Sequence, residues 1–275
     1  MLAPLFQSRV RVIQDVLPTA HEPLLVLTEE YESYYLKYHK ASYNAHEMQA
    51  EWLCAALLRE WGIPTPDVAV LTIGEAVISN LPSNAKRAAS YLKKPCFGSK
   101  AILGAQDSVE LLNGQIELEK LSNAEDLVWL ALYDAWIAND DRRASHHNTL
   151  LAPDDSGKKY IIWAIDHAYA FSRIDLCYLD PQYLYCDFKK NLISATATKA
   201  HLRRWRQHQP LWIEEELRSG FYLRVENCQK RFLDICEWLP PSYKLSERSQ
   251  TALFNFLFSE SRQELLLSRF FECLP

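Results

Sequence analysis

Glycine and cysteine are used in ways that exclude several kinds of protein. The chain has only seven glycines among 275 residues, and the first of them is Gly62. A glycine-rich phosphate-binding loop is therefore excluded from the first 61 residues. The seven cysteines are scattered singly, without a CxxC pair, which argues against a zinc knuckle and a disulfide framework. This cysteine usage is typical of a reduced, cytosolic protein.

Long apolar segments are also missing. No run of eighteen apolar residues occurs, so we expect no membrane-spanning helix. The N-terminal residues 1–18 contain Arg9, Arg11 and Asp15, and they therefore lack the uninterrupted apolar core of a signal peptide. Export is not expected, and the predicted location is cytoplasmic.

The chain carries little net charge. The formal value is −5, so no overall electrostatic field favours a nucleic-acid or membrane partner. Residues 201–208 mix basic and aromatic side chains, as single-stranded nucleic-acid-binding surfaces do. A solvated helix face explains the same pattern, and we favour it.

The N-terminal part reads as strands around one helix. With 48% hydrophobic residues, a chain of this length can bury a large core, and our working picture is a single unit with two lobes. Gly62 and Pro64 end the predicted helix. The predicted order is β-β-α-β-β, made by a hairpin of residues 24–28 and 33–38, a helix of 46–61, and a second hairpin of 68–73 and 76–79.

The C-terminal part is predicted to be mainly helical. Residues 80–94 are the best candidate for a linker, and Gly98 predicts a tight turn at 96–100. Ser122 and Glu125 form a capping-box pattern before a strongly apolar helix of residues 126–138, which we expect to be buried nearly all round. Further amphipathic helices are predicted at residues 202–205, 212–239 and 246–271.

A group of oxygen-bearing side chains follows this apolar helix. Asp141 and Asn148 stand at the two ends of one loop, and Asn148 enters an apolar strand. Asp166 ends a second apolar run, residues 160–165, which would pair with the first through a polar turn. One loop and one hairpin are therefore expected to bring Asp141, Asn148 and Asp166 together.

Phosphoryl transfer requires such a set. A base must orient the acceptor hydroxyl, while oxygen ligands hold magnesium against the phosphates. Magnesium retains waters, so that one amide and one carboxylate suffice as protein ligands. Taken singly, Asn and Asp at loop edges are usually caps and turns. The occurrence of all three residues in this order favours a catalytic site over caps and turns.

The sequence resembles the HipA-like kinases, in particular the short stand-alone HipA-like kinase domains of bacteria. The motifs that carry the resemblance are Tyr133-Asp134-Ala135-Trp136-Ile137, Asn139-Asp140-Asp141-Arg142 with Asn148-Thr149-Leu150-Leu151, and Ile165-Asp166-His167-Ala168-Tyr169-Ala170-Phe171. Upstream, Tyr35-Leu36-Lys37-Tyr38 and the segment from Glu51 to Leu58 are similar to the strand and helix that carry a lysine and a glutamate. The match spans roughly residues 20–175.

The resemblance implies a role for each matched residue. Lys37 would contact the phosphates of ATP, Glu51 would hold Lys37, and Asp141 would be the catalytic base. Asn148 and Asp166 would bind magnesium. Two alternatives stay open, because Glu47 lies one turn before Glu51 and Asp140 directly precedes Asp141.

The resemblance also implies an α+β, bilobal protein-kinase-like fold. The expected N-lobe is residues 1–80, with β-hairpins and one helix, and the expected helical C-lobe is 81–275. Residues 17–23 occupy the place of the family's phosphate loop without a glycine, which favours weak nucleotide binding or an inactive enzyme.

Three functions are compatible with these patterns. The first is an ATP- and magnesium-dependent kinase acting on a serine or threonine of a protein, with an antitoxin-like partner if the chain behaves as toxin members of the family do. The second is a small-molecule phosphotransferase, and the third is a catalytically silent binding module.

His146, His147 and His167 suggest a transition-metal cluster, but adjacent histidines on a strand point apart and the spacing lacks further ligands.

Overall fold

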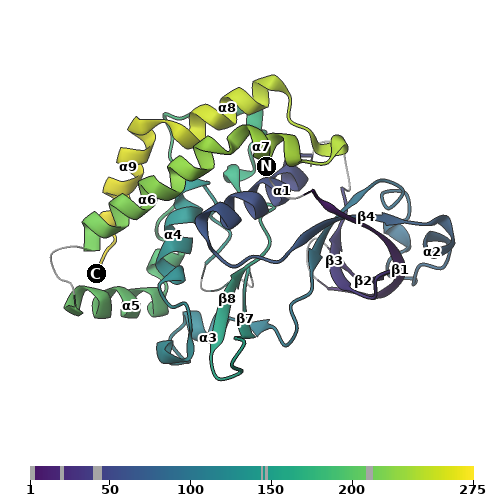
Figure 1. Ribbon diagram of the computed structural model, residues 1–275, viewed down its shortest axis with the longest axis horizontal. Helices are drawn as coiled ribbons and strands as arrows, with labels where there is room; N and C mark the ends of the chain where they lie inside the picture. Colours follow the sequence, from purple (N-terminus) through teal and green to yellow (C-terminus); the bar gives the residue numbers. More distant parts are fainter. Residues whose placement is uncertain (1–3, 19–21, 40–44, 144, 146–147, 209–212) are drawn as a thin grey trace.

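The computed structural model describes residues 4–18, 22–39, 45–143, 145, 148–208 and 213–275. Figure 1 shows a strand-rich barrel at one end of the molecule and a bundle of helices at the other, with α1 (Ala45–Trp61) between them. This is the bilobal α+β arrangement that the sequence predicts. None of the helices in these ranges combines the length and the apolar character needed to cross a bilayer.

The smaller lobe is a closed barrel in which β1 and β4 run parallel and all other neighbours are antiparallel. Side chains of β2 alternate between buried and half-buried positions, so that Leu24 and Val26 face the barrel core with Leu36 and Leu71. Around the barrel the strands follow the order β1 (Phe6–Val16), β2 (Leu24–Thr28), β3 (Ser33–Lys37), β5 (Cys96–Lys100) and β4 (Val68–Ile73).

The tight turn predicted at Gly98 is wrong, because this residue lies inside β5, opposite Leu36 of β3 and Ala69 of β4. A Cβ atom at Gly98 would lie 2.6 Å from Cδ1 of Leu71, so the glycine permits close packing within the barrel. The division of the chain at residue 80 stays a prediction. The strand β5, which follows residue 80 in the chain, completes the barrel.

The strand predicted for residues 76–79 is also wrong. These residues belong to a short helix, α2 (Glu75–Ser79), which starts where the amide of Ile78 donates to the carbonyl of Gly74. Val77 and Ile78 pack against the barrel core from this helix. The place beside β4 is taken by β5, which arrives from further along the chain.

The helix α1 joins the two lobes. Its Trp52 is fully buried and makes edge contacts with Phe97 of the barrel and with Trp238 of α7 (Phe232–Trp238). The helix ends at Gly62, whose φ of 72° lets the amide of Ile63 reach back to the carbonyl of Leu58. The predicted helix and its end at Gly62 are confirmed.

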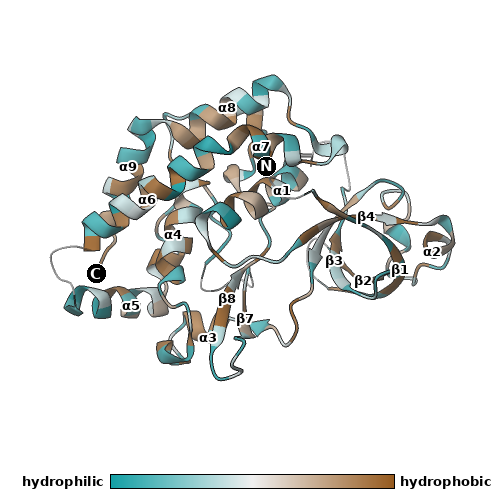
Figure 2. Cartoon of the chain, viewed as in Figure 1, coloured by the Kyte–Doolittle hydropathy of each residue, from teal (hydrophilic) through white to brown (hydrophobic). Residues whose placement is uncertain are grey.

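The larger lobe is built around α4 (Asp126–Trp136), in which every residue from Leu127 to Trp136 is buried, as predicted. The capping box is wrong, since Ser122 donates to Asp154 and Glu125 makes no side-chain cap. Figure 2 shows hydrophilic and hydrophobic residues alternating along α6, α8 and α9. The remaining helices are α3 (Val109–Leu112), α5 (Thr196–His208), α6 (Ile213–Lys230), α8 (Glu247–Phe258) and α9 (Glu260–Phe271).

The predicted long C-terminal helices are each divided in two. Ser246 caps α8, and Ser259 caps α9 by accepting from the amide of Arg262. The predicted hairpin is confirmed as β7 (Thr149–Pro153) and β8 (Tyr160–Ala164), extended by the short β6 (Gln106–Asp107). This small sheet faces the cleft between the lobes and carries the candidate site at one end.

Candidate active site

The hairpin of β7 and β8 brings Asn148 and Asp166 to the same end of the small sheet. Its register pairs Thr149 with Ala164, and the amide of Ile165 then donates to the carbonyl of Asn148 at 3.1 Å. Asn148 therefore enters β7 where Asp166 leaves β8. Asp141 lies on the loop between α4 and β7, and the convergence of these three residues agrees with the predicted hairpin.

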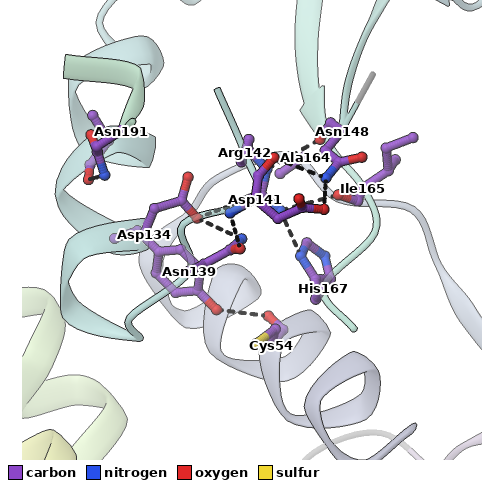
Figure 3. Close-up of polar contacts among 12 residues, drawn as sticks. Cys54, Asp134, Asn139, Asp141, Arg142, Asn148, Ala164, Ile165, His167 and Asn191 are labelled. Carbon is purple, nitrogen blue, oxygen red and sulfur yellow. Dashed lines mark hydrogen bonds and ion pairs between the residues drawn. The ribbon is translucent and has the colours of Figure 1, made fainter. Parts of the chain in front are cut away.

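Asp141 and Asn148 contact each other directly. The side-chain nitrogen of Asn148 donates to Oδ2 of Asp141 at 2.8 Å and to the Asp141 carbonyl at 3.3 Å (Figure 3). The amide of Asp141 in turn donates to Oδ1 of Asn139 at 3.2 Å. Because the Asn148 nitrogen is turned toward Asp141, its oxygen is directed elsewhere and is oriented as an acceptor or ligand.

Lys37 lies between two carboxylates. Its Nζ atom is 2.5 Å from Oε1 of Glu51 and 2.8 Å from Oδ1 of Asp166. The second oxygen of Glu51 accepts from the backbone amide of His167 at 3.1 Å. Among the described residues, Lys37 is paired with Glu51 and Asp166 and not with Glu47. The geometry therefore favours Glu51 over Glu47 as the partner of Lys37.

The charge on Lys37 is well supported. Burial disfavours the ammonium, but Asp166 and Glu51 outweigh it and raise the pKa of Lys37 above its usual value. Burial also raises the pKa of Glu51, with Asp166 adding to the rise and Lys37 opposing it. A protonated lysine is the outcome that both carboxylates favour. Lys37 therefore presents a fixed positive charge to the cleft.

Asp166 adopts an unusual backbone conformation. Its φ is 55°, in the left-handed region that aspartate tolerates better than most residues. Ala138, which follows α4 just before the Asp141 loop, also has a positive φ, of 53°. Such residues cost on the order of 1–3 kcal/mol each and cluster at functional sites. Strain is therefore present on both segments that carry the candidate residues.

A cleft of about 590 Å³ lies between the barrel and the helical lobe. All five predicted residues, Lys37, Glu51, Asp141, Asn148 and Asp166, line it. Its size is within the usual range for small-molecule sites, and most of its remaining wall is apolar. Apolar side chains reach it from both lobes: Leu17, Pro23, Ala55, Pro66, Val68, Phe97, Ile102, Leu150 and Ile165.

The site suits a hard divalent cation better than zinc. Asn148 and Asp166 offer amide and carboxylate oxygens, the donors that magnesium prefers. The described part of the chain holds no group of three histidine, cysteine or acidic side chains able to bind a metal. His167 is buried, and its Nδ1 faces the guanidinium of Arg142 at 2.7 Å. His146 and His147 lie outside the described residues.

Sequence reasoning missed a buried polar network behind the site. Arg142 and Asp134 are fully buried and form an ion pair, and Arg142 also contacts the backbone on either side of the hairpin end. The available signal was Asp134, a charged residue in the middle of the apolar helix α4. A carboxylate in such a place requires a buried partner.

Comparison with family models adds to this geometry, because the model of the HipA-like kinases matches residues 10–271. The chain belongs to the HipA-like kinase family. Comparison with curated proteins finds no match to this HipA-like kinase.

Comparison with solved structures finds kinases that are similar to this chain. The Helicobacter pylori proinflammatory kinase CtkA is similar with a TM-score of 0.55 and 14% identity, covering 98% of this chain and 99% of that chain. A Golgi casein kinase gives a TM-score of 0.46 and 13% identity, covering 98% of this chain and 72% of that chain. The likeness to CtkA shows a kinase-like fold.

Proposed function

We propose that this HipA-like kinase transfers the γ-phosphoryl group of ATP to a serine or threonine hydroxyl of a protein, with magnesium as the cofactor. The observation that carries the proposal is the contact of Lys37 with both Glu51 and Asp166 on the cleft that Asp141 and Asn148 also line. A lysine, a base and two oxygen ligands on one cleft are the parts that phosphoryl transfer by kinases requires.

Each of these side chains would act at a stated atom. Lys37 Nζ would bind the phosphate oxygens of ATP, and Glu51 would hold it in place. A carboxylate oxygen of Asp141, Oδ1 or Oδ2, would take the proton of the acceptor hydroxyl. The oxygen of that hydroxyl would at the same time bond to the γ-phosphorus. The bond between that phosphorus and the bridging oxygen then breaks, so that the products are a phosphoester and ADP.

Asn148 Oδ1 and the Asp166 carboxylate would hold magnesium, and the donor set fits this ion. The chemistry that magnesium supplies when bound is neutralisation of charge on the phosphate oxygens. The Asn148 amide nitrogen would keep Asp141 turned toward the acceptor, because it donates to Oδ2 of that residue at 2.8 Å. The apolar wall, which includes Val68, Phe97 and Leu150, suits a flat nucleotide base.

A catalytically silent module is the second candidate. It is favoured by the segment between β1 and β2, where Leu17 and Pro23 line the cleft in a part of the chain that has no glycine. Without glycine the backbone approaches phosphates less closely, which lowers nucleotide affinity. Activity would then depend on whether Lys37, Asn148 and Asp166 compensate.

Transfer from [γ-³²P]ATP tests the proposal and distinguishes the candidate acceptors. The protein is incubated with magnesium and either a protein lysate or its small-molecule fraction, and Asp166→Ala serves as the matched inactive variant. We expect label in protein with wild type and none with Asp166→Ala. Label in the small-molecule fraction alone would replace the proposal with a small-molecule phosphotransferase. Absence of label from both fractions would favour the silent module.

A further inference from the structure

The side chain of Arg142 is completely buried, directly beside the candidate base Asp141. All three of its nitrogens have partners. Nε donates to the carbonyl of Asn148 at 3.1 Å, and one terminal nitrogen donates to the carbonyl of Ile165 at 3.1 Å and lies 2.7 Å from Nδ1 of His167. The other terminal nitrogen pairs with Oδ1 of Asp134 (Figure 3). Only the planar fork of an arginine can serve so many acceptors at once.

The two carbonyls belong to the two backbone segments that carry the candidate metal ligands. The first is the carbonyl of Asn148 itself, and the second is that of Ile165, which is bonded to the amide of Asp166. A single side chain therefore fixes the position of both ligands relative to each other. Since Arg142 follows Asp141 in the chain, the base is tied to the same framework.

Asp134 is the anchor of this framework. It lies on α4 with no exposed surface, and Oδ1 accepts from Arg142 and, at 3.2 Å, from the side chain of Asn139. Burial raises the pKa of Asp134 to about 7, and Arg142 and Asn139 oppose this rise. Buried ion pairs contribute little to stability compared with apolar replacements. Selection of a single conformation is therefore the better-supported reason for such a pair.

His167 connects the framework to the other lobe. Its Nδ1 atom faces the Arg142 guanidinium and so must be an unprotonated acceptor, while its backbone amide donates to Oε2 of Glu51 at 3.1 Å. Glu51 in turn holds Lys37. The contacts run without a gap from α4 through Arg142 to α1 and β3.

We propose that Arg142, anchored by Asp134, is a positioning residue that sets the placement of Asn148 and Asp166 and thereby the divalent-cation affinity of the site. The inference rests on the proposed function. Groups that orient metal ligands without touching the metal commonly change metal affinity by roughly 10–100-fold when they are removed. Arg142→Lys keeps the positive charge but replaces the fork with one ammonium, which cannot reach both carbonyls and Asp134.

Nucleotide binding provides the test without relying on turnover. The Kd of a non-hydrolysable ATP analogue is measured by calorimetry without divalent cation and with saturating magnesium, and the ratio reports the coupling between the two ligands. We expect Arg142→Lys to bind the analogue alone within about threefold of wild type. The magnesium-dependent ratio should fall on the order of 10-fold or more. Asp134→Asn, which keeps the fork but removes the charge of its anchor, should lower the ratio less.

Arg262→Lys is the matched control. Arg262 is also buried, and it donates to the carbonyls of Trp136, Tyr183, Leu184 and Phe256, none of which lines the cleft. The same substitution there should destabilise the fold and leave the magnesium ratio unchanged. If Arg142→Lys does not fold, Asp134→Asn decides the question by the same ratio.

The outcomes separate the two proposals. A wild-type ratio in both Arg142→Lys and Asp134→Asn overturns the positioning role while the proposed function stands. An equal loss in Arg262→Lys also overturns it, because the effect would then come from general destabilisation. If wild type binds the analogue equally well with and without magnesium, the proposed function fails and the positioning role fails with it.

Discussion

The side-chain nitrogen of Asn148 lies 2.8 Å from Oδ2 of Asp141, so an amide donor separates the candidate base from the neighbouring ligand position. A substitution that changes the charge of either side chain therefore also changes the surroundings of the other. This contact leads to the first prediction, since it places an amide donor against the carboxylate of Asp141.

Asn148→Asp should move the acidic limb of the pH profile to higher pH. The new carboxylate would still suit magnesium, but it places a like charge beside Asp141, and two carboxylates in contact ionise together less readily than one carboxylate beside an amide. The base must be unprotonated to act, so that transfer by the variant should fall away at a higher pH than transfer by wild type as the pH is lowered. The measurement is kcat against pH for wild type and variant. Superimposable profiles would contradict the assignment of Asp141 as the base.

Glu51→Gln should lower kcat/KM on the order of 10–100-fold, which corresponds to roughly 1.4–2.7 kcal/mol. The amide retains the shape of the side chain but removes the charge that holds Lys37 at 2.5 Å and fixes it toward the cleft. Glu47→Gln, one turn earlier on the same helix, is the control and should stay within about twofold of wild type. Equal losses in both variants would remove Glu51 from its assigned role.

The buried carboxyl of Asp126 should make the free energy of unfolding depend on pH, independently of the candidate active site. Burial raises the pKa of this carboxyl from 3.8 to about 6, against a hydrogen bond from Asn123. In the intervening pH range the folded state binds a proton that the unfolded state lacks, so the contribution of Asp126 to the free energy of unfolding falls as the pH rises.

Asp126→Asn should abolish this slope. Measured by urea unfolding, the stability of wild type relative to the variant should decrease between pH 3.8 and about 6, with a slope of at most roughly 1.4 kcal/mol per pH unit. Above that range the difference should be constant. Parallel stability curves across the whole range would show that burial does not perturb this carboxyl.

The sequence could predict the parts of the site that depend on local pairing. The register of β7 and β8 follows from two apolar runs joined by a polar turn, and this register alone places Asn148 beside Asp166. Lys37 and Glu51 were assigned through the family resemblance, and their contact follows from how α1 packs against the barrel. Residues that meet through short connections were therefore predictable.

Contacts that depend on distant parts of the chain could not be predicted from the sequence. Gly98 reads as a turn in isolation, and only its position between β3 and β4 shows that it belongs to a strand. The strand β1 was missed because Phe6 to Val16 presents mainly exposed side chains and pairs with β4, about 60 residues later. Arg142 is one charged residue among several in its loop, and its burial follows from the position of Asp134 on α4.

The central claim is that Asp141 is the base of a working phosphoryl-transfer site, and single-turnover transfer from [γ-³²P]ATP tests it most directly. Asp141→Asn should slow transfer on the order of 10²–10⁴-fold, the usual contribution of a positioned general base. Magnesium-ATP should bind this variant within about threefold of wild type, because Asp141 does not contact the nucleotide or the metal in the proposed arrangement. Equal transfer rates for wild type and Asp141→Asn would contradict the account and make Asp140 the next candidate for the base.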